Sequence, residues 1–401
     1  MFHNSTTFHS LWPDGFFKLT PTGIVQEFQL GQWFRQRYNS YLGPQYNASD
    51  LYIRSSDTDR TLMSAESFLA GIYKDGTSPL EEFGLRWRPI PVHTVAQENE
   101  FLLGLASCPL LSKMRDEIMN SSSSKEYENQ HRPLLEYLRN ATGNHTVNRY
   151  NAGCISDSLI CMKANEKPLP SWYRDDVFNE LLNFTMFYSN KKHVETREQL
   201  RLEIGVYVDA FIKHMLSITK LDFIEHAMSR KHVLVFSAHD TTVTNVLAAF
   251  GVFDGKMVEY ASAVITELVG PHPPADASHY RLRLLYKRGW NDSVGTYILP
   301  KPCSTNDGTK SDDGCPLNLV LDYLRPLALK LDDFRAACDV NTTANLTPSR
   351  VPRSSTELIW LVCSIAVMIP ALCLVYVYVR YRKRKRSVRI DFEQFHSSAD
   401  A

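Results

Sequence analysis

The sequence predicts an α/β protein, because a short apolar run gives way to a helical pattern at two separate places. Residues 233–236 are rich in Val and Phe, as in a buried strand, and apolar residues recur at helical spacing over 243–250. Residues 52–53 begin a second strand, and 61–73 have the pattern of a helix. A third observation is that 260–268 and 280–286 have the pattern of antiparallel strands.

The remaining elements are predicted around this sheet. Apolar spacing indicates a helix over 22–41 and a last helix over 317–331. Prolines interrupt residues 85–95, which favours an edge strand there. Residues 100–220 are mainly helical and are expected to form a cap subdomain within a domain that spans 1–340.

One histidine and one aspartate, adjacent in the sequence, occupy the position that is most informative about function. His239 and Asp240 follow the strand at 233–236 and come just before the helix, where open α/β sheets bind ligands and where a helix N-terminus favours an anion. The simpler alternative is a helix cap beside a surface histidine. Arg54 occupies the equivalent position after the strand at 52–53 and is suited to bind phosphate; its alternative is an ion pair with Asp57 or Asp59.

Composition and charge exclude several classes of function. The 401 residues have a formal net charge of zero, 44% hydrophobic and 22% charged residues, which is ordinary for a folded protein. Seven Lys or Arg and three Asp or Glu follow Val379, so residues 1–379 have a net charge of −4. The main body is therefore not a nucleic-acid binder. The sequence has no metal-ligand spacing and no Gly-rich phosphate loop, so we expect neither a metal nor another cofactor.

A membrane span is predicted near the C-terminus. Residues 358–379 contain no charge and as a helix would be about 33 Å long, enough to cross a bilayer core. A basic cluster at 380–386 follows at once, which places the tail 380–401 in the cytoplasm and the main body outside it. Residues 341–357 are polar and are expected to form a stalk. A buried core helix is the alternative for 358–379.

Glycosylation sites and cysteines also favour a lumenal or extracellular body. The Asn-X-Ser/Thr acceptors all precede the predicted span: Asn4, Asn47, Asn120, Asn140, Asn144, Asn183, Asn291, Asn341 and Asn345. Six cysteines precede it too, an even number that suggests three disulfides. Residues 1–10 contain no apolar signal-peptide core, so either the true start lies upstream or the span itself is the insertion signal.

Several segments together resemble the histidine acid phosphatases, with the lysosomal, prostatic and testicular type the most similar. They are Tyr52-Ile53-Arg54-Ser55-Ser56-Asp57 with Asp59-Arg60-Thr61-Leu62-Met63-Ser64-Ala65, Pro89-Ile90-Pro91-Val92-His93-Thr94, Leu169-Pro170-Ser171-Trp172 and Ser237-Ala238-His239-Asp240-Thr241-Thr242. The resemblance covers roughly residues 11–340. It implies a mixed sheet flanked by helices, of the phosphoglycerate-mutase and histidine-phosphatase kind, with a helical cap.

The resemblance also implies a two-step mechanism. A histidine in an Arg-His-Gly-X-Arg-X-Pro block attacks phosphorus and becomes phosphohistidine, which divides one difficult displacement into two easier ones. By match, Arg54 binds phosphate, His239 is the second histidine that holds the phosphoryl oxygens, and Asp240 protonates the leaving alkoxide. An aspartic acid must be protonated to act, so an acidic optimum is expected.

The sequence departs from the family pattern in two ways. The Arg-His-Gly-X-Arg-X-Pro block is absent, and neither His3 nor His9 has its flanking residues, so the nucleophile and the first sheet strand are expected to be missing. Ala263 stands where relatives carry a cysteine whose partner matches Cys161. Together with the extra Cys154, the resemblance implies the disulfides Cys154–Cys161, Cys108–Cys338 and Cys303–Cys315.

The leading hypothesis is a type I membrane acid phosphatase that hydrolyses phosphomonoesters at the lysosomal or plasma membrane, here inactive for lack of its nucleophile. The first alternative is a catalytically inactive membrane glycoprotein that binds phosphorylated ligands through Arg54 and His239. A second alternative is a surface glycoprotein whose role lies in its basic tail, which attracts anionic lipids. The resemblance further suggests a homodimer.

Overall fold

In a computed structural model of the chain, the described residues are 11–104, 106–220, 233–304 and 313–338. All of them belong to one compact unit, residues 1–340. The predicted stalk, membrane span and tail lie outside the described residues, as do residues 1–10. Within the described ranges, no helix has both the length and the apolar character needed to span a membrane.

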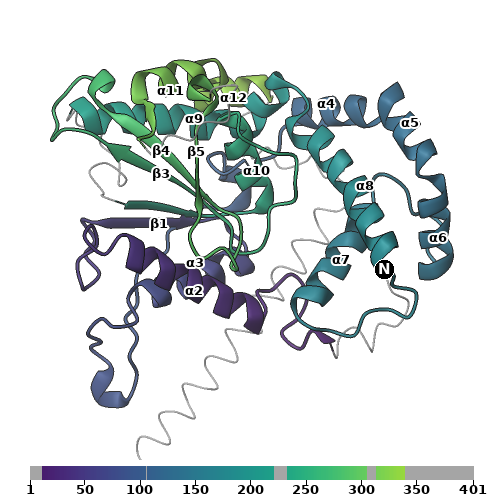
Figure 1. Cartoon of the computed structure of the whole chain (residues 1–401), viewed down its shortest axis with the longest axis horizontal. Helices are drawn as coiled ribbons and strands as arrows, with labels where there is room; N and C mark the ends of the chain where they lie inside the picture. The colour runs from purple at the N-terminus through teal and green to yellow at the C-terminus, as the bar shows by residue number, and fades with distance from the viewer. Residues whose placement is uncertain (1–10, 105, 221–232, 305–312, 339–401) are drawn as a thin grey trace, which may run out of the picture. The chain divides into compact units, whose positions relative to one another are not determined.

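Two small sheets form the centre of the unit (Figure 1). β1 (Leu51–Ser55) pairs in parallel with β2 (Val233–Ser237). In the second sheet β4 (Arg281–Lys287) pairs antiparallel with β3 (Ala263–Val269), and also with the short strands β5 (Thr296–Ile298) and β6 (Cys315–Pro316). The predicted strands 260–268 and 280–286 are thus antiparallel neighbours, as expected.

Helices cover both faces of these sheets. α2 (Pro21–Arg37) and α3 (Asp59–Ile72) pack on one face, where Leu30, Phe34 and Phe68 form an apolar cluster with residues of β1. On the other face lie α9 (Arg197–Lys220), α10 (Asp240–Ala249) and α11 (Leu317–Leu324), and α12 (Leu331–Ala337) packs against α9. Helices thus lie on both sides of the strands, as expected from the sequence.

Local sequence explains where the two helices under the sheet begin and end. Thr20 caps α2 by accepting a hydrogen bond from the Gly23 amide at 3.1 Å, and Pro21 is at the first turn, where its missing N–H costs nothing. α2 ends at Arg37 rather than at the expected Tyr41. α3 begins at Asp59, two residues before the predicted start.

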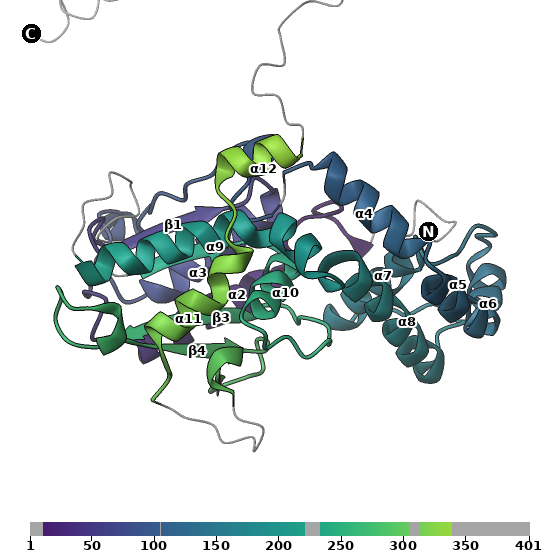
Figure 2. The same cartoon turned by 90° about the horizontal axis from the view of Figure 1, so that it is seen from above.

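A helical cap projects to one side of the sheets (Figure 2). It consists of α4 (Pro109–Met119), α5 (Ser122–Gln130), α6 (Arg132–Thr142), α7 (Ala152–Ala164) and α8 (Asp175–Val194). Leu138, Leu181 and Phe184 are fully buried in its own apolar cluster. The cap is smaller than the predicted 100–220, because α9 turns its apolar face toward the sheets instead.

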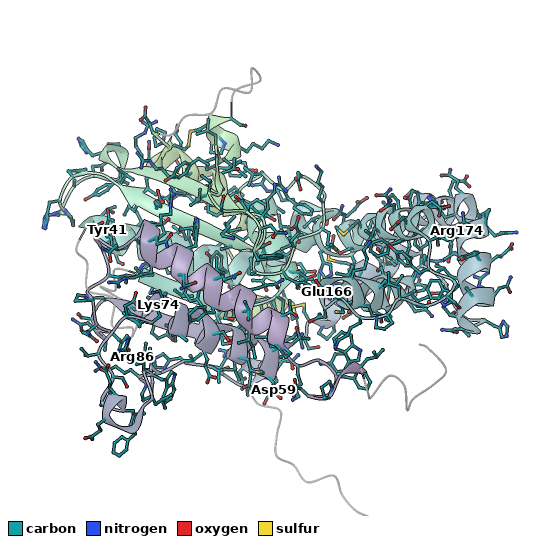
Figure 3. The ribbon with its side chains drawn as sticks, turned by 60° about the horizontal axis from the view of Figure 1, so that its bottom comes forward. Tyr41, Asp59, Lys74, Arg86, Glu166 and Arg174 are labelled. Carbon is teal, nitrogen blue, oxygen red and sulfur yellow. A yellow bond between two sulfur atoms is a disulfide. The ribbon has the colours of Figure 1, made fainter. Side chains whose placement is uncertain are left out.

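Proline explains two further differences from the predicted elements. The segment expected as an edge strand at 85–95 pairs only at His93, in an isolated bridge with Arg54, because Pro89 and Pro91 cannot donate to a ladder. Part of this segment projects from the core around Arg86 (Figure 3). The last helix divides after Leu324, where a 3₁₀ turn begins at Arg325 and contains Pro326. The 3₁₀ turns are η1 (Glu81–Phe83), η2 (Gln97–Asn99), η3 (Ala277–His279), η4 (Lys301–Cys303) and η5 (Arg325–Leu327).

Two disulfides are formed, Cys108–Cys338 and Cys303–Cys315, and both pairs are among those implied by the resemblance. The expected Cys154–Cys161 bridge is wrong, since both thiols are free. The two residues lie seven positions apart in α7, so their Cα atoms are separated by about 10 Å of helical rise. A disulfide requires Cα atoms within about 7 Å.

β2 is less buried than its sequence predicts. Val233, Leu234, Val235 and Phe236 form an apolar run, yet all are half-buried, as is most of β3. Among the described strands, β2 pairs only with β1, and β3 only with β4. The apolar sequence of β2 is typical of a strand that is covered on both faces and paired on both edges. Among the described strands, however, only one of its edges is paired.

The contact between α2 and α3 depends on two glycines. A Cβ atom added at Gly71 would lie 2.1 Å from the Phe28 carbonyl oxygen, and one added at Gly31 would lie 2.1 Å from the Phe68 carbonyl oxygen. Neither backbone can move without separating the two helices. We expect Gly71→Ala to lower the free energy of unfolding by about 1–3 kcal/mol, as overpacking does, in urea titrations followed by circular dichroism.

Gly153→Ala in α7 is the matched control. Nothing lies within 4 Å of its added Cβ, and alanine favours a helix, so unchanged or slightly raised stability is expected. Equal effects of the two substitutions would contradict the role of Gly71 in helix contact.

Candidate active site

His239 is held at the junction of β2 and α10. Its backbone is extended (φ −117°, ψ 162°), and it is the residue that precedes the first turn of α10. The ring Nε2 lies 3.1 Å from the Ser56 hydroxyl, and Nδ1 lies 3.3 Å from an Arg60 guanidinium nitrogen. The site therefore joins the turn after β1 to the turn after β2.

Hydrogen bonds from hydroxyl and amide groups connect these two turns. The Ser56 amide donates to the Ser237 carbonyl at 3.0 Å, and the Ser237 hydroxyl donates to the Thr61 carbonyl at 2.8 Å. The Thr61 hydroxyl lies 2.8 Å from the Ser56 hydroxyl. Because Ser56 and Thr61 are buried, these bonds fix the position of the hydroxyl that contacts His239.

The surroundings favour the neutral form of the His239 ring. Burial lowers the pKa of His239, the nearby Arg60 charge lowers it further, and Asp240 opposes both. A neutral ring that accepts a hydrogen bond from Arg60 at Nδ1 carries its proton on Nε2, from which it donates to Ser56. An anion placed between Arg60 and His239 would favour the protonated ring instead.

Asp240 is exposed at the start of α10, and its carboxylate accepts a hydrogen bond from the Thr241 amide at 2.8 Å. Asp157 of α7 lines the same cavity. Burial raises the pKa of the Asp157 carboxyl, the Asp240 charge raises it further, and Arg60 lowers it. The cap thus places a second acid next to Asp240 and Arg60.

Arg54 lies elsewhere. Its guanidinium makes hydrogen bonds of 2.8–3.2 Å to both carboxylate oxygens of Glu100, a fully buried residue, and it does not line the cavity that His239 borders. Arg54 therefore pairs with neither Asp57 nor Asp59, the two alternative partners expected from the sequence. Its partner is Glu100, 46 positions away. Here Arg54 is a partly buried arginine that pairs with a buried carboxylate.

Arg60 is the residue that the sequence reasoning missed. It is the second residue of α3, and it is exposed on the side that faces His239. A signal was present, because Arg60 belongs to the same segment as Arg54 and lies at a helix N-terminus after a strand. Choosing between them requires knowing which way each side chain points.

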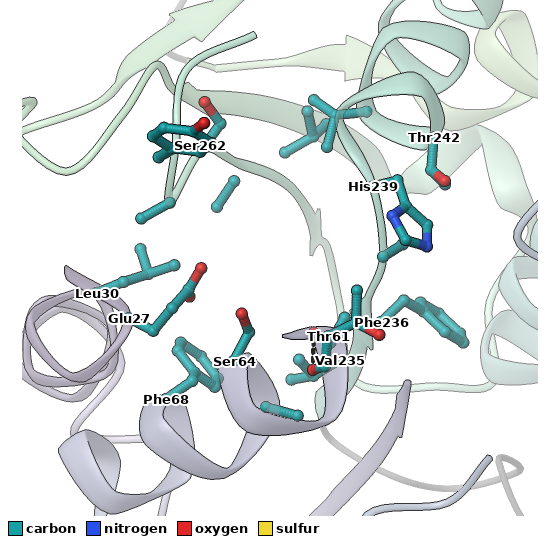
Figure 4. Close-up of a pocket in the computed structure, with 18 of the residues that line it drawn as sticks. Glu27, Leu30, Thr61, Ser64, Phe68, Val235, Phe236, His239, Thr242 and Ser262 are labelled. Atoms are coloured by element: carbon teal, nitrogen blue, oxygen red, sulfur yellow. Dashed lines mark hydrogen bonds between the residues drawn. The ribbon is translucent and has the colours of Figure 1, made fainter. Parts of the chain in front are cut away.

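A large cavity opens between β2 and β3 beside this site. Its volume is about 3230 Å³, and its walls include every residue of β2 and β3. Glu27 and Leu30 of α2 and Phe68 of α3 surround it together with His239 (Figure 4). Burial raises the pKa of Glu27 to about 7, although the Lys287 charge opposes this. No group of three metal-ligating side chains occurs within the described ranges.

This arrangement belongs to a known class of protein. The chain is a member of the histidine phosphatase superfamily, branch 2, whose family model matches residues 2–287. Its curated relatives are acid phosphatases, which are phosphoric monoester hydrolases.

The individual relatives match most of the chain. Lysosomal acid phosphatase of Xenopus laevis is 30% identical over 83% of this chain and 73% of its own length. Prostatic acid phosphatase of Bos taurus is 32% identical over 81% of this chain and 80% of its own, and testicular acid phosphatase of Homo sapiens is 32% identical over 77% and 69%.

Solved structures confirm the fold. The phytase from Citrobacter braakii superimposes with a TM-score of 0.57 at 14% identity, covering 79% of this chain and 90% of that one. The Hafnia alvei phytase in complex with tartrate gives a TM-score of 0.57 at 13% identity, covering 79% and 89%.

The raised pKa of Glu27 predicts a pH-dependent stability. An unfolded Glu27 ionises near 4.5 and the folded one near 7, so folding is penalised progressively as the pH rises from 4.5 to 7. Glu27→Gln should match the parent below pH 4.5 and exceed its free energy of unfolding above pH 7, by up to about 3 kcal/mol. Urea titrations at pH 4.5 and pH 8 measure the difference.

Glu66→Gln, at an exposed position of α3, controls for the removal of a carboxylate. If the Glu27 variant gained no more stability at pH 8 than at pH 4.5, the assigned pKa of Glu27 would be wrong.

Proposed function

We propose that this site binds the phosphoryl group of a phosphomonoester between Arg60 and His239. The observation that carries the proposal is the meeting of the two side chains, 3.3 Å apart, at the adjacent ends of β1–α3 and β2–α10. Fixed donors from a guanidinium and an imidazolium match the charge that spreads over phosphoryl oxygens during transfer. The helix N-termini of α3 and α10 add favourable fields for an anion.

Asp240 is proposed to donate the proton to the leaving alkoxide. A nucleophilic histidine forms a bond to phosphorus while the bond to the alkoxide oxygen breaks, and the carboxylic acid proton of Asp240 passes to that oxygen. Water then attacks the phosphohistidine, releases inorganic phosphate and returns a proton to Asp240. Asp157, whose pKa burial raises, faces the same leaving-group side.

The nucleophile is proposed to come from the Arg-His-Gly block that the resemblance implies and that the 401 residues do not contain. Of the described residues that line the cavity, the other histidines are His214 and His272. His214 lies on α9, about two helical turns beyond Tyr207, whose ring contacts Phe236 of β2. The ring of His272 is hydrogen-bonded to the Pro273 carbonyl. Neither histidine is therefore proposed as the nucleophile. The chain by itself is therefore expected to bind phosphate with little or no turnover.

Phosphate binding tests this proposal. Arg60→Gln should weaken the binding of inorganic phosphate at least tenfold, since hydrogen bonds to charged groups contribute about 1.5–3 kcal/mol, and should leave the melting temperature nearly unchanged. Isothermal titration calorimetry at pH 5 measures the affinity, and release of an aryl alcohol from an aryl phosphate measures turnover in the same preparation.

Arg54→Gln is the matched control. It leaves the buried Glu100 carboxylate without its cation, so it should lower the stability by several kcal/mol while the folded fraction still binds phosphate. Phosphate affinity that depended on Arg54 and not on Arg60 would contradict the site. Turnover by the 401-residue chain that Asp240→Asn abolished would contradict the missing nucleophile.

We also propose that residues 358–379 anchor a lumenal or extracellular phosphatase domain in the membrane, with 380–401 in the cytoplasm. The support is the uncharged run, the basic cluster behind it and the glycosylation acceptors ahead of it. Protein recovered in the soluble fraction after alkaline washing of membranes would contradict this topology. Whether the membrane is lysosomal, and whether the chain forms a homodimer, stay predictions from the family.

A further inference from the structure

The cap side of the candidate site holds two groups that the proposed reaction does not use. Asp157 and Cys161 lie one helical turn apart on α7, so their Cβ atoms are about 5–6 Å apart, and both line the cavity of the site. The Cys161 thiol lies 3.0 Å from the hydroxyl of Tyr260, a residue of the turn before β3. Asp157 and Tyr260 are therefore neighbours where the cap meets the sheets.

The Asp157 carboxylate has no ion-pair partner within the described ranges, and the residue is exposed in the cavity. Two lysines that line the same cavity already have acidic partners. Lys163 lies 3.6 Å from Asp175, and Lys18 pairs with Asp59. The Asp157 carboxylate is therefore available to a cation that a ligand brings.

The charge of Asp157 acts where the leaving group would stand. Burial and the Asp240 charge raise the pKa of the Asp157 carboxyl, and the Arg60 charge lowers it, so Asp157 lies near both of these residues. Asp240 is the proposed proton donor, and Arg60 is the proposed phosphate-binding cation. A phosphoryl group that binds Arg60 would neutralise its charge. Asp157 would then face the leaving group with no cation to balance it.

Tyr260 presents an aromatic surface beside this carboxylate. The residue is 43% exposed, so a ligand can reach its ring. The turn around it fixes its position. The Trp290 amide donates to the Tyr260 carbonyl at 3.2 Å, and the next residue, Ala261, has a left-handed backbone (φ 54°) that is uncommon outside a constrained turn. The turn therefore holds the ring at the rim of the cavity.

The chemistry of these two groups selects the kind of leaving group. A second anionic group would be repelled by Asp157, and a purely apolar group would remove the carboxylate from water without giving it a partner. A hydroxyl would donate to the carboxylate but would not balance its charge. An alkylammonium satisfies the carboxylate and also interacts favourably with an aromatic ring.

We propose that Asp157 and Tyr260 determine the specificity for the leaving group and favour phosphomonoesters of amino alcohols, in which a short carbon chain joins an ammonium group to the ester oxygen. This inference rests on the proposed function, because a phosphoryl group bound between Arg60 and His239 sets where the leaving group stands. Asp157 acts by binding the ammonium group, and proton donation stays with Asp240.

Three phosphate esters that differ chiefly in the charge of the leaving group test this specificity. 2-Aminoethyl phosphate ends in an ammonium group, propyl phosphate in a methyl group and phosphoglycolate in a carboxylate. Isothermal titration calorimetry on the full-length chain in lipid nanodiscs at pH 6.5 should show affinity falling in that order, by roughly fivefold at each step, as for exposed ion-pair and cation–π contacts.

Asp157→Asn should remove most of the differences among the three esters. Its affinity for inorganic phosphate should stay the same or rise, because the variant loses a negative charge near Arg60. Tyr260→Leu should weaken binding of 2-aminoethyl phosphate by roughly twofold to fivefold, whereas Tyr260→Phe, which keeps an aromatic ring, should not.

Glu136→Gln is the matched control, since Glu136 is an exposed residue of α6 that does not line the cavity, and it should keep the order of the three esters. Equal affinities for the three esters would overturn the assignment but leave the phosphate site in place. An order that Asp157→Asn left intact would do the same. If neither the esters nor inorganic phosphate bound, the proposed phosphate site itself would be wrong, and the assignment with it.

Discussion

Parallel pairing of β1 with β2 places the carboxyl ends of both strands at one edge of the sheet, and the candidate site depends on this constraint. Register from Leu51 with Val233 to Ser55 with Ser237 brings Ser56 directly beside the turn that carries His239. The hydrogen bonds among Ser56, Thr61 and Ser237 then hold the starts of α3 and α10 together. A one-residue slip in this register would move Arg60 away from His239 as well as exchange the two faces of β2.

The charges around His239 have opposite effects on the pKa of its ring, because Arg60 lowers it and Asp240 raises it. Burial and Arg60 lower the pKa of the ring, and a phosphoryl group bound between Arg60 and His239 would favour the protonated ring instead. Asp157 lies near Asp240, and its raised pKa limits the negative charge on the side where a leaving group would stand. Glu27 is a second carboxylic acid with a raised pKa, and it lies in the apolar part of the cavity. It is neutral below about pH 7, where its burial no longer opposes folding.

Local patterns in the sequence predicted the strand-to-helix junctions and the place of His239 and Asp240, because hydrophobic periodicity and chain reversal are short-range properties. The partner of Arg54 could not be predicted in this way. Glu100 is distant in sequence, and only the folded chain shows that its carboxylate accepts hydrogen bonds from Nε and Nη2 of the Arg54 guanidinium. The predicted disulfide between Cys154 and Cys161 was wrong for the opposite reason. Their sequence separation is short, but a continuous helix keeps them apart.

The half-buried state of β2 connects the open cavity to the site. Leu234 and Phe236 occupy the strand that ends at His239, and their outward backbone groups have no ladder partner among the described strands. A strand bound on one edge only is held less firmly than a central strand, since local opening depends on how many hydrogen bonds and apolar contacts must break. The backbone that positions His239 is therefore expected to open more readily than that of a strand paired on both edges.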